Sequence, residues 1–174
     1  MGSMDWKRIY GMLERATPLP FDCGRLCGKR CCSGIQTGRG VYLFPGEEKL
    51  FAGESTWCTV EEFVPEEVHF TGGGFLLNCC GDCPRSMRPL SCRLFPLAPR
   101  LHGQGNFDLI FEPDAVFTCP LVQLNDIDML DPAFIEGARM VWLELVKDER
   151  VWSGLQEYMA RLKREETLPW TRLL

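Results

Sequence analysis

The sequence predicts a small α+β domain with short strands, an irregular cysteine-rich core and a C-terminal helical hairpin. Three features predict this class: short runs rich in β-branched and aromatic residues, prolines and cysteines crowded between them, and two late apolar stripes with helical spacing. The chain has 174 residues, a length that suits one domain. We therefore expect a single domain over residues 4–174, with residues 1–3 a remnant of an expression vector.

The first predicted element is an amphipathic helix over residues 5–16, whose apolar side chains share one face. Asp5 suits its start, because the carboxylate can accept a hydrogen bond from an otherwise unpaired backbone N–H. Pro18 and Pro20 end the helix and lead an extended segment into the first cysteine.

The middle of the chain predicts short strands. Residues 41–44 form one candidate strand, and residues 68–70 and 75–78 form two more around a run of three glycines. The glycine run is expected to be a hairpin loop, because no helix pattern follows it as a phosphate-binding loop requires. Residues 107–112 are a further candidate strand.

Residues 45–51 predict a helix start, with proline in the first turn. Glu47 and Glu48 would then lie near the positive end of the helix dipole. A carboxylate at this place is also a potential iron ligand, although a helix-start charge is the commoner role.

The C-terminal region predicts two helices. Asp131 and Pro132 are a capping carboxylate followed by proline at the first helical position. A break near Asp148 separates two apolar stripes, which are Phe134, Ala138, Val141, Trp142 and Leu145, then Val151, Leu155, Tyr158, Met159 and Leu162. We expect an antiparallel hairpin that covers the cysteine-rich half of the domain.

Two cysteine-dense stretches, residues 23–32 and 79–93, hold eight of the ten cysteines. Short spacings between thiols, with glycines beside them, are typical of zinc sites and iron–sulfur clusters. Four prolines exclude a long helix over residues 83–99, so a bound metal would fix this irregular segment. These features predict a metal-binding core.

Basic residues accompany both stretches although the net charge of the chain is −5. Such cations favour the thiolate form of nearby cysteines and offset its negative charge. The basic residues are Arg25, Lys29 and Arg30 at the first stretch, and Arg85, Arg88, Arg93 and Arg100 at the second. Disulfides and inert buried thiols are the alternatives. Disulfides need an oxidising compartment, and the N-terminal sequence has no signal-peptide pattern.

The adjacent pairs at positions 31–32 and 79–80 leave the ligand set open, because neighbouring side chains tend to diverge. One site with spare thiols and two sites are both compatible with the sequence, and choosing Cys80 over Cys79 is a guess. The candidate metal ligands are Cys23, Cys27, Cys31, Cys32, Cys80, Cys83, Cys92 and Cys119. The cofactor is an iron–sulfur cluster, such as 4Fe–4S, or zinc; the thiol count exceeds one zinc site and favours the cluster.

At these residues the chain resembles the CxxCxxCC-type zinc- or iron-chelating family, the YkgJ-like cysteine cluster proteins. The matching features are the cysteines of residues 23–32, the apolar-glutamate run of residues 41–48, and Cys83…Arg88-Pro89…Cys92-Arg93…Phe95-Pro96. The resemblance implies metal chelation. Three residues, rather than two, separate the first cysteines here. The chain also resembles part of the longer flagellin lysine methylases, which implies an enzymatic alternative.

The composition of the chain limits the kinds of partner that we expect it to bind. The acidic net charge argues against general nucleic-acid binding, and no apolar run approaches the ~20 residues that span a bilayer. The thiol content suggests a reducing cytoplasm, such as that of an anaerobic bacterium.

We expect a metal-binding protein with a redox or maturation role. The alternatives are a cluster-dependent enzyme such as a methyltransferase, acting on a small molecule, and a structural zinc module for a protein partner. Common catalytic motifs are absent from the sequence, so whether the chain is an enzyme stays open.

Overall fold

A computed structural model of the chain describes residues 4–33, 40–53, 55–62, 71–80, 83–103 and 105–166. Its α-helices are α1 (Trp6–Gly11), α2 (Gly24–Cys27), α3 (Arg30–Ser33), α4 (Leu90–Leu94), α5 (Pro132–Leu145) and α6 (Glu149–Glu166). Its strands are β1 (Val41–Leu43), β2 (Cys58–Glu62), β3 (Phe75–Cys79), β4 (Leu97–Gly103) and β5 (Asn106–Phe111). Short 3-10 helices cover Glu47–Phe51, Arg85–Met87, Pro113–Phe117, Pro120–Leu124 and Ile127–Met129. The predicted α+β class is confirmed.

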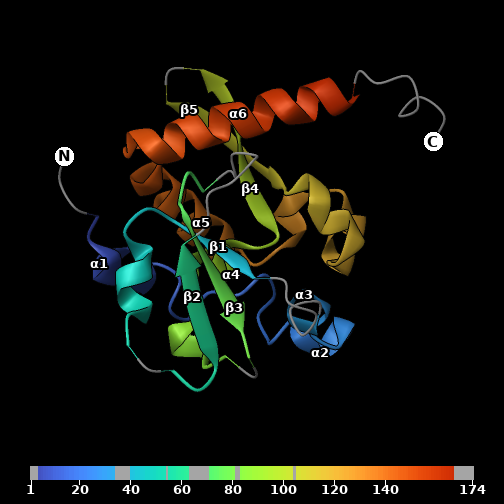
Figure 1. Cartoon of the computed structure of the whole chain (residues 1–174). Coiled ribbons are helices and arrows are strands. Elements are labelled where there is room, and N and C mark those ends of the chain that lie inside the picture. The colour runs from blue at the N-terminus through green and yellow to red at the C-terminus, as the bar shows by residue number, and fades with distance from the viewer. Residues whose placement is uncertain are drawn as a thin grey trace.

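The strands form two antiparallel sheets. In the first, β3 lies between β1 and β2, and in the second, β4 pairs with β5 (Figure 1). The first sheet has its own small core of Leu43, Phe51, Cys58 and Leu77. Its end at Cys58 and Cys79 lies on the side of the molecule where α2 and α3 are found (Figure 1).

A close backbone approach fixes the entry to β3. A Cβ atom at Gly73 would lie 1.8 Å from the carbonyl oxygen of Leu43, so no other residue fits there without moving β1. The predicted loop glycines therefore help to align two strands that are distant in sequence. The predicted strand over residues 68–70 lies outside the described residues.

The main core joins the helices to the second sheet. Phe44, Phe134 and Trp142 are among its fully buried side chains, and the rings of Phe44 and Trp142 meet edge to face at 5.7 Å. Because Phe44 directly follows β1, this contact ties the first sheet to α5.

The two C-terminal helices are confirmed. Asp131 caps α5 by accepting a hydrogen bond from the Ala133 N–H at 2.8 Å, and Asp148 lies in the short link to α6. The apolar stripe of α5 is buried, as are Val151, Leu155 and Tyr158 of α6. However, α6 packs along β4, at the far end from α2 and α3, rather than over the cysteine-rich stretches (Figure 1).

The N-terminal helix is shorter than predicted. Asp5 caps it, with the Arg8 N–H donating to its carboxylate at 3.1 Å, but α1 ends at Gly11. Glycine weakens a helix, and the next residues continue as turns. Leu13 nevertheless remains buried in the core.

The segment from Cys83 to Pro99 is more regular than predicted, because it holds α4 and the start of β4. Pro89 directly precedes α4, and the N–H that proline lacks is not needed there. Strand β2 was not predicted, because it ends in Glu61 and Glu62 and glutamate is uncommon in strands. Within the described residues, no helix has the length and apolarity required to cross a membrane.

Candidate metal centre

The first cysteine stretch folds into two single-turn helices with a sharp reversal between them. Cys23 directly precedes α2, Cys27 ends it, and α3 begins two residues after Gly28. Gly28 and Lys29 both have left-handed backbones, with φ of 60° and 58°. This conformation is easy for glycine and costly for lysine. After this reversal, Cys27 of α2 and Cys31 of α3 line the same hollow.

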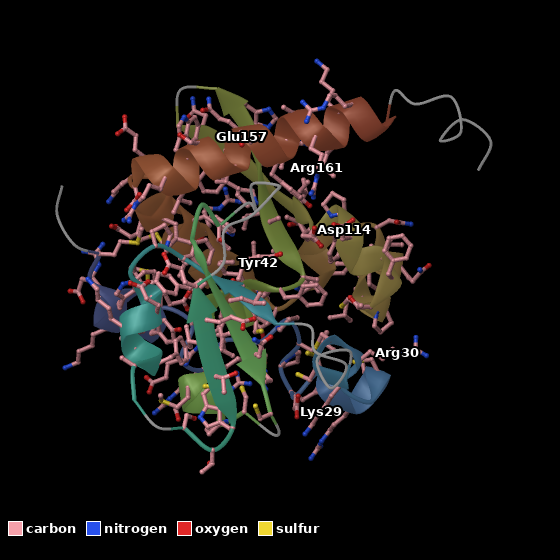
Figure 2. All side chains as sticks on the ribbon, viewed as in Figure 1. Lys29, Arg30, Tyr42, Asp114, Glu157 and Arg161 are labelled. Carbon is pink, nitrogen blue, oxygen red and sulfur yellow. The ribbon has the colours of Figure 1, made fainter. Side chains whose placement is uncertain are left out.

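The second stretch starts at the end of β3 and runs into α4. Cys79 is the last residue of β3, and the N–H of Cys80 donates to the Trp57 carbonyl at 2.7 Å. Cys83 follows, and Cys92 lies in α4. Figure 2 shows sulfur atoms beside α2 and α3 and at the nearby ends of β2 and β3, with Lys29 and Arg30 at the outer edge of this region.

Glu47 anchors α4 rather than facing the thiols. Its carboxylate is fully buried and accepts hydrogen bonds from the Tyr10 hydroxyl at 2.5 Å, the Phe44 N–H at 2.8 Å and the Leu90 N–H at 2.7 Å. Burial raises the pKa of Glu47, while these donors act in the opposite direction. Both carboxylate oxygens of Glu47 are thus hydrogen-bonded within the fold. Glu47 therefore has a structural role, which differs from the two predicted roles of helix-start charge and iron ligand. Glu48 accepts from the Gly46 N–H at 2.8 Å.

Arg93 also builds the scaffold of the site. Its guanidinium donates to the backbone carbonyls of Arg88 at 2.9 Å, Ser86 at 2.8 Å, Arg85 at 3.3 Å and Tyr10 at 3.4 Å. It also lies 4.4 Å from the centre of the Tyr10 ring. These contacts tie the loop before α4 to α1, which places Cys83 and Cys92 relative to each other.

Of the four arginines that the sequence associates with the second stretch, Arg88 faces the thiols. Burial alone would lower its pKa, but a hydrogen bond with Cys83 and the nearby Cys32 and Cys92 raise it. Arg100 lies on β4 beside Asp108, at 3.8 Å, and Arg85 donates to the Ala16 carbonyl at 3.4 Å. Of these four arginines, Arg88 is therefore the one placed to offset the negative charge of the thiolates.

Four thiols form one group: Cys32, Cys83 and Cys92 lie near Arg88, and Cys79 lies near these three thiols. Burial raises the pKa of Cys92, and Cys32, Cys79 and Cys83 are the neighbours that raise it further. Burial likewise raises the pKa of Cys79 to about 11, with contributions from Cys83, Cys58 and Cys32. Thiols from α3, from the end of β3 and from α4 thus lie close enough to affect one another's ionisation. We call this set the Arg88 thiol group.

A second set of thiols, Cys23, Cys27 and Cys119, lines a hollow together with Cys31 and Cys92. Burial raises the pKa of Cys23, and Asp22, Cys119 and Cys27 raise it further. Burial also raises the pKa of Cys119. Cys119, which is distant in the sequence, therefore lies near Cys23 and Cys27 of the first stretch.

Cys31 and Cys32 link the two sets. The Cys31 thiol donates a hydrogen bond to the Cys32 sulfur; with Arg88 and Lys29 nearby, this lowers the pKa of Cys32 to about 6. The same hydrogen bond, together with burial, raises the pKa of Cys31. The predicted divergence of these neighbours is not observed.

Cys79 and Cys80 differ in their surroundings. Cys80 is exposed, with its sulfur 3.9 Å from the Asn78 carbonyl, whereas Cys79 is half-buried beside other thiols. This geometry favours Cys79 as a member of the converging set. Strand alternation carries that signal in the sequence, since Phe75, Leu77 and Cys79 share one face of β3.

Across the described ranges, no three cysteine, histidine, aspartate or glutamate side chains stand close enough to hold a metal ion as they are. The thiols are gathered but not yet arranged around a common centre. No family model, curated protein or solved structure matches this chain.

Proposed function

We propose that this protein binds an iron–sulfur cluster or a zinc ion through the Arg88 thiol group, in a reducing cytoplasm. The observation that carries the proposal is that Cys32, Cys83 and Cys92 lie near Arg88, while Cys79 lies near these same thiols. Four thiolates complete a tetrahedral zinc site or hold a cubane cluster. We also propose that the chain belongs to the YkgJ-like cysteine cluster family.

The charges near the thiols support this proposal. Four thiolates around a divalent metal leave a net negative site, which a nearby cation stabilises. Arg88 supplies that cation from within the fold, and Lys29 adds a second beside Cys32. A guanidinium keeps its charge at any pH that the protein meets, so the compensation does not depend on conditions.

Rearrangement of the side chains on metal binding is expected. Thiols must lose their protons to bind a metal, so binding releases protons and changes the contacts that the thiols make. Cys32 is an exposed residue on a single-turn helix and already lies near Cys92, so little movement of the backbone is needed. Six thiols lie outside this group, and four of them, Cys23, Cys27, Cys31 and Cys119, are enough for a second centre. We propose a redox or maturation role for the bound metal or cluster.

The test is purification without oxygen, followed by a visible spectrum and by iron, zinc and acid-labile sulfide measurements per chain. A brown protein with a broad band near ~400 nm and sulfide matching its iron establishes a cluster. A colourless protein with about one zinc per chain establishes a zinc centre. Metal-free protein after reconstitution with either metal under reducing conditions contradicts the proposal.

The hollow beside the thiols favours a second candidate, a cluster-dependent enzyme such as a methyltransferase. Cys23, Cys27 and Cys119 line this hollow, and Arg88 lies on its wall, so a small molecule bound there would lie beside several thiols. The test is thermal unfolding of the metal-loaded protein with S-adenosylmethionine. A ligand that binds the folded state raises its apparent stability. An unchanged midpoint at saturating concentration argues against this candidate.

A further inference from the structure

Cys58 and Cys79 lie directly opposite each other on β2 and β3. The N–H of Cys80 donates to the carbonyl of Trp57, so the ladder hydrogen bonds flank this pair instead of joining it. A pair in this position has its Cα atoms about 4.5 Å apart and its side chains on the same face. A disulfide needs Cα atoms about 4.4–6.8 Å apart, so the backbone already suits one.

Both side chains point into the small core of the first sheet. Cys58 is buried there with Leu43, Phe51 and Leu77, and Cys79 packs against the same cluster. Cys79 is half-buried, so a reagent reaches its sulfur before that of Cys58. Cys58 has no part in the proposed metal centre, and its position opposite Cys79 is otherwise unexplained.

We propose that Cys58 and Cys79 form a dithiol that is reversibly oxidised to a disulfide across β2 and β3. The oxidant is a low-molecular-weight disulfide of the glutathione class. The Cys79 thiolate attacks one sulfur of this disulfide, the S–S bond breaks, and one small thiol leaves with the proton that Cys79 lost.

The second step closes the protein disulfide. Cys58 gives up its proton and attacks the Cys79 sulfur, the mixed disulfide breaks, and the second small thiol leaves. Two protein thiols and one small disulfide thus become one protein disulfide and two small thiols. The bond joins strands that the sheet already holds together, so β2 and β3 need not separate.

This pair also gives the metal centre a redox control, an inference that rests on the proposed function. Cys79 cannot be a thiolate ligand and a disulfide partner at the same time. Oxidation therefore removes one thiol from the Arg88 thiol group, and bound metal protects Cys79 from oxidation.

The test oxidises the metal-free full-length chain with glutathione disulfide, blocks the remaining thiols and maps the linkage by mass spectrometry. Trypsin alone leaves both cysteines on one peptide, so digestion adds a glutamate-specific protease that cuts between them. The expected product is residues 55–61 linked to residues 68–85, with fragment ions that assign the bond to Cys79. Recovery of Cys58 as a blocked thiol, or its linkage to Cys80 or Cys83, overturns the pair.

Two neighbouring substitutions supply the control. C79A is expected to abolish the linked peptide, and C80A, one residue away, is expected to keep it. A linked peptide that survives C79A overturns the assignment. If either variant fails to fold, the fragment ions from the unmodified chain still decide.

The final arm repeats the oxidation with zinc-loaded protein. Where free zinc exceeds its Kd about tenfold, linkage is expected to be about tenfold slower, because only metal-free protein reacts. Equal rates with zinc still bound overturn the control of the metal centre and the role of Cys79 as a ligand. Such rates would not contradict the disulfide itself, so the disulfide and the redox control of the metal centre are tested separately.

Discussion

The carboxylate of Glu47 accepts a hydrogen bond from the backbone N–H of Leu90, 43 residues later in the chain, at 2.7 Å. Leu90 is the first residue of α4, so this bond satisfies one of the N–H groups that a helix start leaves unpaired. Because Cys92 lies in the same short helix, a buried carboxylate sets the position of a candidate metal ligand that it does not touch.

Replacing Glu47 with glutamine is expected to destabilise the protein by about 1–3 kcal/mol, because an amide nitrogen cannot accept the bond from Phe44 or Leu90. Urea unfolding of the metal-free protein measures the change. Glu48→Gln is the control, since Glu48 accepts one hydrogen bond and is only half-buried. Equal losses in the two variants would contradict the anchoring role.

Replacing Arg93 with lysine is expected to lower the free energy of unfolding by about 1–3 kcal/mol. Lysine keeps the charge but loses the planar fork that reaches several carbonyls and lies over the Tyr10 ring. Arg100→Lys is the matched control, because the exposed pair of Arg100 with Asp108 contributes about 0–1 kcal/mol. A loss in the control as large as that in Arg93→Lys would contradict the role of the carbonyl contacts of Arg93.

The alkylation rate of Cys32 in metal-free protein is expected to change with pH in a distinctive way. Because its pKa is lowered to about 6, the rate should rise with pH up to that value and level off above it. Cys79, with its pKa raised to about 11, should continue to gain reactivity well above neutral pH. Mass spectrometry of iodoacetamide-treated protein follows each residue.

Cys31→Ala removes the thiol that donates to Cys32. The inflection in the Cys32 profile is therefore expected to move to higher pH, toward the ordinary cysteine range. An unchanged inflection would assign the effect to Arg88 and Lys29 alone.

The elements with local signals were predictable from the sequence. Asp131 and Pro132 mark the start of α5 because a cap and a fixed φ act within one turn, and the stripe that includes Trp142 follows directly. Strand β5 was also predicted, because the residue types that favour a strand lie within one short run. The location of α6 was not predicted, because β4, against which it packs, is distant in the sequence.

The candidate site was predictable in composition but not in arrangement. Cysteine spacing identified Cys32, Cys83 and Cys92, which the structure brings together. The distinction between Cys79 and Cys80 depends on the register of β3 against the unpredicted strand β2. The roles of Glu47 and Arg93 depend on contacts with α1 and α4, which no local pattern encodes.

The measurement that tests the central claim most directly is the metal content of three proteins purified together without oxygen: the unmodified chain, Cys79→Ser and Cys80→Ser. If the Arg88 thiol group is the metal centre, Cys79→Ser should lose most of its metal and Cys80→Ser should keep it, because Cys79 is half-buried beside Cys32 and Cys83 whereas Cys80 is exposed. Full loading of Cys79→Ser, or an equal loss in both variants, would contradict the account.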